Sequence, residues 1–452
     1  MNIVDGLQRV FHSPAFKFVL IIGLILALTI PLLMVALLVS ERERNASRAS
    51  SDVSRMWSEA QTVRGPYIVV PTTRIVDVRK KDGIEQQTVH ELAVFLPENL
   101  DIVAETSTER RRRGIFEIPV YRSTLSFKGR FIPPIVRSFE QSGTQLHWEQ
   151  ASLALTLDDV RGIKKTAVLS FGDGSAPQKF RAGLEVPAAR QTQGIHLPLS
   201  AAQAKGGFPF SFALELNGSR NLQFVPTGGE TSVTIKSDWP HPSFTGAFLP
   251  DQSEISDAGF QASWKIPRLA RGIGQTLKFT QLLPLMHTKS FGVDFYQPVR
   301  FYTLAERALK YALGFISIIF LAVFVMEIQS QKRVHWIQYL FVGFSLIVFY
   351  LVLIGTAEHI GFDLGYLAAA VATSLLVGTY VGMVVRSLLR GLSLVAILGV
   401  IYALLYLLLR IEDYALLIGS LAAFVLLATV MFATRNVDWS RGSRSMTDNE
   451  GA

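Results

Sequence analysis

Residues that could do chemistry lie in a few short stretches, and the most conspicuous is a run of four consecutive arginines. A basic run of this density can bind lipid phosphates or other polyanions, or it can be a solvated strand edge or turn before Gly114. The sequence leaves both interpretations open. The candidates for contact with anionic lipids or envelope polymers are Arg110, Arg111, Arg112 and Arg113.

Two further stretches hold candidate contact residues. Glu358 and His359 are adjacent titratable residues between two apolar runs. Because histidine titrates near neutral pH, they could form a pH-sensitive contact with the outer domain, or they could lie in a hydrated turn. The proline-rich segment Trp239–Pro250 is stiff and is expected outside a strand, as a recognition surface or a cap on a sheet. Its candidate contact residues are Trp239, His241 and Phe244.

Catalytic motifs are missing from the chain. It contains no HExxH, GxSxG, SxxK, GxxxxGK[ST] or GxGxxG pattern. It has no cysteine, which excludes thiolate ligands and disulfides, and its eight histidines are scattered. We therefore expect a non-enzymatic protein with no catalytic site, no metal site and no cofactor.

Six apolar runs are each about as long as a helix needs to be to cross roughly 30 Å of hydrocarbon. The charged side chain among them is Glu327, which lies near the end of its run and is expected to be solvated at the interface. Without other ionisable groups, the runs argue against an ion-coupled transporter. The predicted transmembrane helices are residues 18–39, 311–328, 336–355, 364–385, 392–409 and 414–433, and the last five are expected to form one bundle.

Basic residues predict the orientation of these helices, because Lys and Arg are retained on the cytoplasmic side. The first run is expected to remain as an anchor, since it is longer than the apolar core of a signal peptide and charged residues follow it. Both ends, residues 1–17 and 434–452, are predicted in the cytoplasm, and residues 40–308 in the periplasm. Nine basic residues flank one side, against Arg410 on the other: Arg9, Lys17, Lys332, Arg333, Arg386, Arg390, Arg435, Arg441 and Arg444.

Residues 40–308 have the composition of a soluble domain, with 33 basic and 27 acidic side chains. Helical spacing predicts a stalk over 40–63, and alternating apolar residues predict a β-rich region over 65–265. No helical run there is long enough to cross over between parallel strands, so we expect an antiparallel sandwich or barrel-like sheet. The stretch 264–298 has little period and is expected to be an irregular return. The fold class is thus a membrane protein with six transmembrane helices and a large mainly-β domain between the first two.

Several segments, in order along the chain, resemble the CreD family of inner-membrane proteins, also described as cell-envelope integrity proteins. The resemblance implies the same topology, together with an association with envelope integrity, with induction by a two-component system that responds to carbon source, and with altered colicin sensitivity. It implies no reaction and no catalytic residue, and the run of four arginines is more basic than the family leads us to expect. The segments are Arg64–Pro71, Asp238–Pro250, Gly259–Trp264, Glu306–Tyr311, Gln338–Gly343, Glu358–Phe362 and Thr434–Trp439.

Three functions are compatible with these features. The first is a non-enzymatic inner-membrane protein that contributes to envelope integrity or stress response through its periplasmic β domain. The second is a sensor or accessory subunit of a membrane signalling complex, and the third is a protein that handles lipid or cell-wall precursors. The expected partners are membrane lipids, and anionic envelope polymers or other envelope proteins. The net charge of +8 does not indicate nucleic acid, because much of it belongs to the outer segment and to the membrane boundary.

Overall fold

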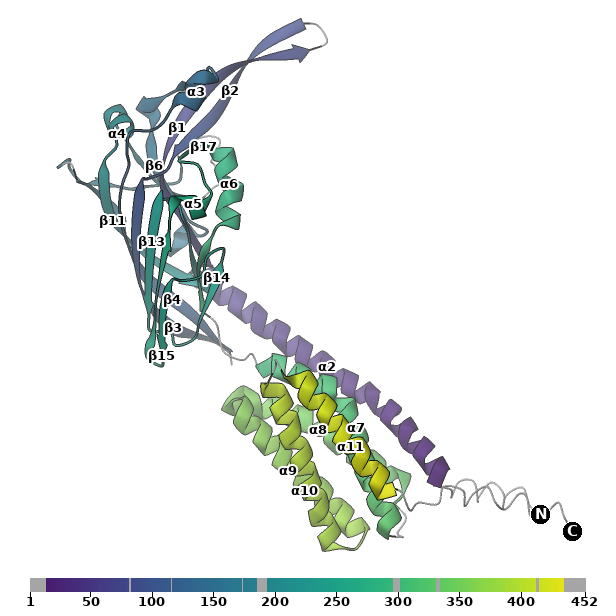
Figure 1. Ribbon diagram of the computed structural model, residues 1–452. Coiled ribbons are helices and arrows are strands. Elements are labelled where there is room, and N and C mark those ends of the chain that lie inside the picture. Colours follow the sequence, from purple (N-terminus) through teal and green to yellow (C-terminus); the bar gives the residue numbers. More distant parts are fainter. Residues whose placement is uncertain are drawn as a thin grey trace, which may run out of the picture. The chain divides into compact units, whose positions relative to one another are not determined.

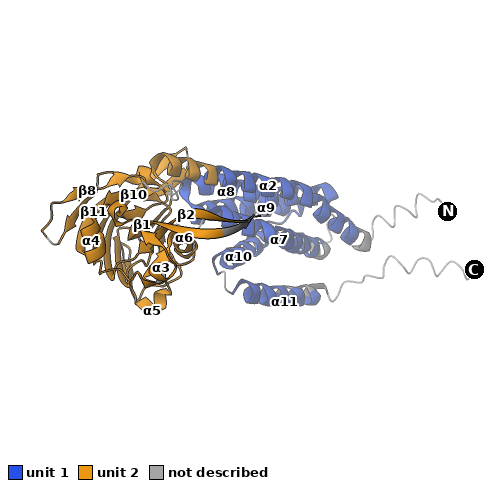
Figure 2. Cartoon of the chain, turned by 90° about the horizontal axis from the view of Figure 1, so that it is seen from above, with its two compact units in different colours: residues 1–46, 299–452 blue, residues 47–298 orange. Residues whose placement is uncertain are grey.

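The computed structural model divides the chain into two compact units (Figure 2). Unit 1 contains residues 1–46 and 299–452, and unit 2 contains residues 47–298. The structure describes residues 14–80, 83–114, 116–172, 174–184, 193–295, 301–330, 334–411 and 414–434. The predicted cytoplasmic ends, 1–17 and 434–452, lie outside the described residues except for 14–17 and Thr434.

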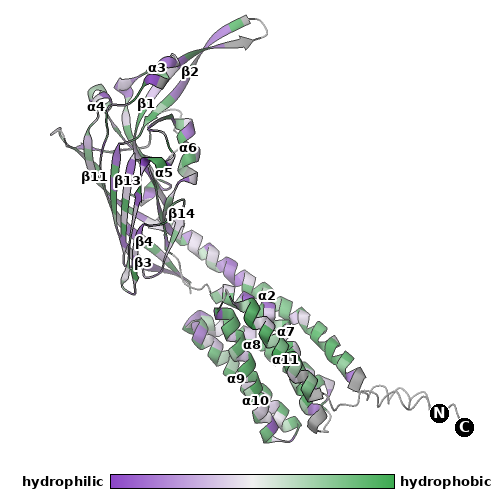
Figure 3. Cartoon of the chain, in the orientation of Figure 1, coloured by the Kyte–Doolittle hydropathy of each residue, from purple (hydrophilic) through white to green (hydrophobic). Residues whose placement is uncertain are grey.

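Unit 1 is built from apolar helices, as the hydropathy colouring shows (Figure 3). Five stretches are long and apolar enough to cross a membrane: Lys17–Trp57, Phe301–Glu327, Trp336–Ile360, Phe362–Val384 and Leu388–Arg410. The sixth predicted span falls on a helix whose apolar stretch, Ala415–Thr429, is shorter, so the count of six stays a prediction. The helices are α2 (Pro14–Trp57), α7 (Phe301–Ser330), α8 (Trp336–Ile360), α9 (Phe362–Val384), α10 (Leu388–Arg410) and α11 (Ala415–Thr434).

Helix α2 is a single helix of 44 residues that continues through Pro31. At 1.5 Å per residue it is about 66 Å long, roughly twice the thickness of membrane hydrocarbon. Its first part is hydrophobic, whereas its second part carries hydrophilic residues (Figure 3). The helix ends at Trp57 and the first strand begins at Gln61, so the predicted helical stalk 40–63 is six residues too long.

Unit 2 contains two large β-sheets (Figure 1). Sheet A has the strand order β14-β18-β12-β1-β6-β10-β9, with β2, β5 and β17 paired beside this path. Its strands are β1 (Gln61–Lys80), β2 (Gly83–Phe95), β5 (Gln145–Leu146), β6 (Ser152–Thr156), β9 (Arg181–Ala182), β10 (Gly194–Pro198), β12 (Asn221–Val225), β14 (Pro242–Gly246), β17 (Thr276–Lys278) and β18 (Phe291–Phe295).

Sheet B has the strand order β15-β16-β13-β3-β4-β11-β7-β8. Its strands are β3 (Asn99–Arg113), β4 (Phe116–Arg130), β7 (Val168–Phe171), β8 (Gln178–Lys179), β11 (Pro209–Ser219), β13 (Glu230–Ser237), β15 (Gln252–Ser256) and β16 (Gly259–Ile266). Short helices connect the strands of both sheets: α3 (Arg137–Gln141), α4 (Ala201–Gly206), α5 (Arg268–Arg271), α6 (Phe279–Thr288) and the 3-10 turns η1 (Trp148–Gln150) and η2 (Val160–Gly162).

The prediction of an antiparallel domain is wrong at two strand pairs. Strand β1 runs parallel to β12, with Gln61 opposite Leu222, and β3 runs parallel to β13, with Asn99 opposite Glu230. A parallel pair needs a long connection, which we expected to be a helix. Here the connection consists of the other strands of the two sheets, because the paired segments are more than 100 residues apart.

Two segments expected outside strands form one strand pair. Within Trp239–Pro250, strand β14 pairs with β18, which lies in the stretch 264–298 predicted as an irregular return. That stretch also contains β17 and helix α6. Strand β18 is buried along nearly its whole length. Phe291, Val293 and Phe295 alternate with Gly292 and Asp294, but a run of five residues is too short for its period to identify a strand.

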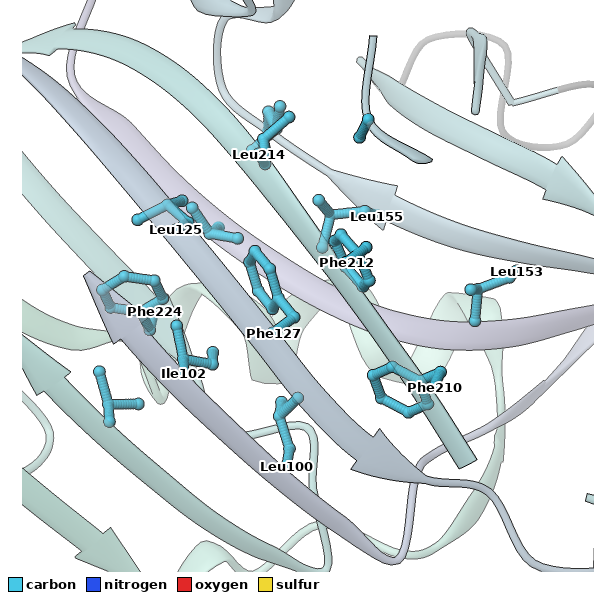
Figure 4. Packing of buried hydrophobic residues seen from close by; sticks show 14 of the residues in the cluster. Leu100, Ile102, Leu125, Phe127, Leu153, Leu155, Phe210, Phe212, Leu214 and Phe224 are labelled. Carbon is cyan, nitrogen blue, oxygen red and sulfur yellow. The ribbon is translucent and has the colours of Figure 1, made fainter. Parts of the chain in front are cut away.

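The core of unit 2 has two layers, and β1 contributes alternate side chains to each. Ile68 and Val70 belong to the cluster between the two sheets, whereas Tyr67 and Val69 belong to a second cluster, between sheet A and helix α6. The two sheets therefore pack as a sandwich, with α6 covering the other face of sheet A. Figure 4 shows the cluster between the sheets, with Leu100, Ile102, Leu125, Phe127, Phe210, Phe212 and Leu214 from sheet B and Leu153, Leu155 and Phe224 from sheet A.

Candidate functional site

The junction between α2 and β1 is held by one buried carboxylate. Asp159 accepts hydrogen bonds from the hydroxyl of Ser58 at 3.3 Å and from the backbone N–H of Glu59 at 3.1 Å. Arg161 donates to the same carboxylate from its backbone and from its guanidinium, at 2.9 to 3.0 Å. Burial opposes ionisation of Asp159, but these hydrogen bonds outweigh it and hold the pKa of the carboxyl below its usual range. The end of α2 is thereby tied to the segment before η2, through the two residues that follow the helix.

The predicted arginine contact, Arg110–Arg113, lies on the β3–β4 hairpin, and all four side chains are ion-paired. Arg110 and Arg112 meet Glu117 at 3.5 and 2.6 Å. Arg111 meets Glu109 at 2.8 Å, and Arg113 meets Asp52 of α2 at 3.2 Å. The hydrogen bond from Arg112 is the main reason that the pKa of Glu117 is lowered. An external polyanion would have to compete with these carboxylates.

Three cations surround the indole ring of Trp57, the last residue of α2. The Arg111 guanidinium lies 4.6 Å from the ring centre, the Arg122 guanidinium 5.3 Å and the Lys164 ammonium 5.6 Å. Glu109 pairs with Arg111 and also with Arg122, at 3.1 Å. Cations are attracted to the face of an indole ring, but they repel one another, so this cluster favours an additional anion.

An open groove with a volume of about 1160 Å³ lies on the outer face of sheet B, next to this cluster. Most of its lining residues are polar, and they carry charges of both signs. Strand register places one row of outward side chains across six adjacent strands, in the order Glu254, Gln261, Lys236, Glu105, Thr124 and Glu215. The next row brings Arg122 opposite Asn217. Side chains from six strands therefore form the groove.

The aromatic loop candidates lie largely in the core. Trp239 is 4% exposed, and its indole N–H donates to the carbonyl of His241 at 3.0 Å. Phe244, on β14, packs edge-to-face against Phe260 and Trp264. His241 is exposed. Two of the three aromatic candidates therefore pack against the sandwich, and His241 is the one left at the surface.

Glu358 lies near the C-terminal end of α8, within unit 1. Its carboxylate accepts a hydrogen bond from the hydroxyl of Tyr302 at 3.0 Å and lies 4.0 Å from the guanidinium of Arg42. Its side chain is only 9% exposed, and it joins residues of α2, α7 and α8. The neighbouring His359 is exposed.

The expectation of a solvated Glu327 is wrong. This residue is 8% exposed, and it forms an ion pair with Lys17. It also accepts hydrogen bonds from the hydroxyl of Tyr339 and from the backbone N–H of Val334, each at 2.9 Å. The sequence could not reveal the pair, because its two members are 310 residues apart.

Five apolar helices of membrane-spanning length together with a two-sheet domain define a membrane protein with a large mainly-β domain. The family model described as "Inner membrane protein CreD" matches residues 13–440. The chain is 32% identical over 433 residues to Inner membrane protein CreD of Escherichia coli (strain K12), and the match covers 94% of each chain. The chain therefore belongs to the CreD family of inner membrane proteins, which confirms the resemblance.

Sequence reasoning missed the residues at the cationic end of the groove, Arg122, Lys164 and Asn217. Each comes from a different segment, and none belongs to a motif. Alternation along β4 places Arg122 on the outer face, but only the pairing of β4 with β11 brings it opposite Asn217. In the part of the chain that the structure describes, no group of three or more His, Cys, Asp or Glu residues could hold a metal ion.

Proposed function

We propose that this protein is a non-enzymatic component of the cell envelope, and that its β domain contributes to envelope integrity by binding an envelope constituent. The observation that carries the proposal is the open polar groove on the outer face of sheet B. A surface to which six strands contribute suits recognition better than catalysis, because it presents many polar contacts over a wide area. Membership of a family of inner membrane proteins supports the proposal, because the inner membrane is part of the cell envelope.

The proposal includes an orientation, with both chain ends in the cytoplasm and unit 2 in the periplasm. The distribution of basic residues supports it. The natural chain has no cysteine, so single cysteines can report orientation. We expect Leu249→Cys, at a residue 74% exposed, to react with a membrane-impermeant maleimide in cells with a permeabilised outer membrane. Ser443→Cys should react only after lysis, and the reverse pattern would contradict the orientation.

The proposed function is tested in cells that lack the gene. We expect these cells to be more sensitive than wild type to detergent and to low osmolarity under conditions in which the protein is made. Restoring the full chain should reverse the defect. Equal sensitivity with and without the gene would count against a role in envelope integrity.

A sensor or accessory subunit is the second candidate, and the junction at Asp159 favours it. Helix α2 is continuous from its apolar part to Trp57, and its end is tied to the segment before η2 by the contacts of Asp159. Such a helix could transmit a displacement of the β domain to a partner protein. Crosslinking in membranes that recovers no partner would argue against this function.

A protein that handles lipid or cell-wall precursors would use the same groove. Its polar walls suit a sugar or peptide portion rather than acyl chains. The candidate differs from the first in that the bound molecule would be an intermediate passed on to another protein.

A further inference from the structure

The side chain of Asn217 at the cationic end of the groove is buried but unsatisfied. Asn217 is 1% exposed, and neither its amide nitrogen nor its amide oxygen has a hydrogen-bond partner among the described residues. It lines the groove. Because a buried amide without partners is destabilising, such groups are normally satisfied by protein, water or a ligand. Asn217 can offer a ligand one acceptor and two donors.

Two cations lie beside this amide in the groove wall. Arg122 is directly opposite Asn217 in strand register, and Lys164 lies in the same wall. Both approach the ring of Trp57 together with Arg111. Glu109 forms ion pairs with Arg122 and Arg111. In the described part of the chain, no ion pair joins Lys164 to a carboxylate. Guanidinium and ammonium groups beside a free amide suit an anionic oxygen group with a neighbouring N–H or hydroxyl.

Outward carboxylates line the groove beyond the cations. Glu105 and Glu254 are exposed outward carboxylates, and Lys236 lies between them in the same row. Neighbouring strands are about 4.8 Å apart, so β11 with Asn217 lies roughly 10 Å from β3 with Glu105 and roughly 24 Å from β15 with Glu254. An extended peptide rises about 3.3 Å per residue, so three residues span the shorter distance and about seven span the longer one.

We propose that the groove binds a short peptide with a free carboxylate and a free amine. The carboxylate and its neighbouring amide N–H lie at Arg122, Lys164 and Asn217, and the amine lies at Glu105, which four extended residues can reach. This chemistry is that of the stem peptides of the bacterial cell wall. The inference rests on the proposed function, for which it names the ligand class.

The test is a binding titration with the full chain in neutral lipid nanodiscs and the tetrapeptide L-Ala-γ-D-Glu-diaminopimelate-D-Ala as the probe. We expect the paired change Arg122→Gln and Lys164→Gln to weaken binding by about tenfold or more, because charge-assisted hydrogen bonds are lost. Lys164→Arg keeps the charge and should bind within about threefold of wild type. Lys128→Gln is the matched control, because Lys128 faces outward from β4 but does not line the groove.

Asn217→Asp distinguishes recognition of the anion from a general effect of charge on the surface. The change keeps the size of the side chain and places a carboxylate where the ligand anion would lie, so we expect binding to be lost. Amidation of the peptide carboxylates and acetylation of its amine should each weaken binding of the wild-type protein by about tenfold.

Three results would overturn the inference: equal binding by wild type and the paired variant, equal loss with Lys128→Gln, or full binding of the amidated peptide. Competition by inorganic phosphate without any effect of amidation would assign the cations to a phosphate group instead. If deletion of the gene weakens the envelope but the titration shows no binding, only the ligand assignment fails. If the peptide binds but deletion has no effect, the proposed function fails.

Discussion

The guanidinium of Arg271 donates a hydrogen bond of 2.6 Å to the carbonyl of Thr227. Arg271 is completely buried, and it also donates to Gly228 and to the side chain of Gln275, which in turn donates to Leu96 and Pro97. These carbonyls lie in two of the connections by which the chain passes from sheet A to sheet B, β2 to β3 and β12 to β13. Burial, and secondarily the neighbouring Arg268, lowers the pKa of Arg271 to about 10, so it remains charged at neutral pH.

Arg271→Met should destabilise unit 2 strongly. The change leaves buried carbonyls without a donor, and removal of one partner from such a network costs about 3–5 kcal/mol. Arg268→Met on the same helix is the control, because Arg268 is half exposed and its pair with Glu98 should contribute at most about 1 kcal/mol. Urea unfolding of the full chain followed by tryptophan fluorescence measures both. Similar midpoints for the two variants would refute the role assigned to Arg271.

The carboxylate of Asp159 should make the junction at the end of α2 sensitive to acid. Its pKa is lowered in the folded state, so its contribution to stability is complete above the unfolded value of about 3.9 and is lost as the pH falls through the folded value. Asp159→Asn should therefore lower stability at pH 7 and flatten the dependence of stability on pH below about 5. Thermal unfolding of the full chain between pH 3 and pH 7 measures this.

Arg161→Gln provides the matched comparison for Asp159. It removes the side-chain donors but keeps the carboxylate, so the folded and unfolded pKa values of Asp159 lie closer together and acid should remove less stability than in wild type. An unchanged pH profile in both variants would show that the junction does not depend on the charge of Asp159.

Gly378 and Gly382 form a GxxxG pair on α9, and they should allow α10 to pack closely against this helix within unit 1. A methyl group on Gly391 of α10 would lie 2.8 Å from the carbonyl oxygen of Gly378 and 3.0 Å from the Cα of Gly382. Because backbone atoms must move apart, Gly391→Ala should destabilise the bundle by about 1–3 kcal/mol. Gly399→Ala on the same helix meets nothing within 4 Å and should leave it unchanged. Thermal denaturation in detergent compares the two, and equal melting temperatures would contradict close packing of α9 on α10.

Local patterns in the sequence predicted the helices and strands better than they predicted which strands pair with each other. Apolar runs predicted the helices of unit 1, and alternation predicted strands such as β4 and β11, because each pattern depends on neighbours in the chain. The parallel pairs β1–β12 and β3–β13 were missed because pairing joins segments more than 100 residues apart. The arginine run was identified from its composition, whereas its partners Asp52 and Glu117 and the groove beside it were not, because they depend on strand pairing and on the packing of α2.

The pair of Lys17 and Glu327 gives the sharpest test of how unit 1 is assembled. The Lys17 ammonium binds Glu327 and also donates to the carbonyl of Val334 at 2.7 Å. Lys17→Met leaves a buried carboxylate without its cation, which should cost about 3–5 kcal/mol. Adding Glu327→Gln should recover more than half of this loss, because the neutral amide oxygen can still accept from the N–H of Val334 while the amide NH2 group donates to the hydroxyl of Tyr339.

Lys310→Met is the control for the Lys17 and Glu327 variants. Lys310 forms an exposed ion pair with Glu306 at 3.5 Å, which should contribute less than about 1 kcal/mol. The measurement is the fraction of chain that remains monodisperse after heating in detergent. Equal loss in the single and double variants would show that Lys17 acts by itself. A loss that the second change repairs would establish that α2, which precedes unit 2 in the chain, is bound to α7, which follows it.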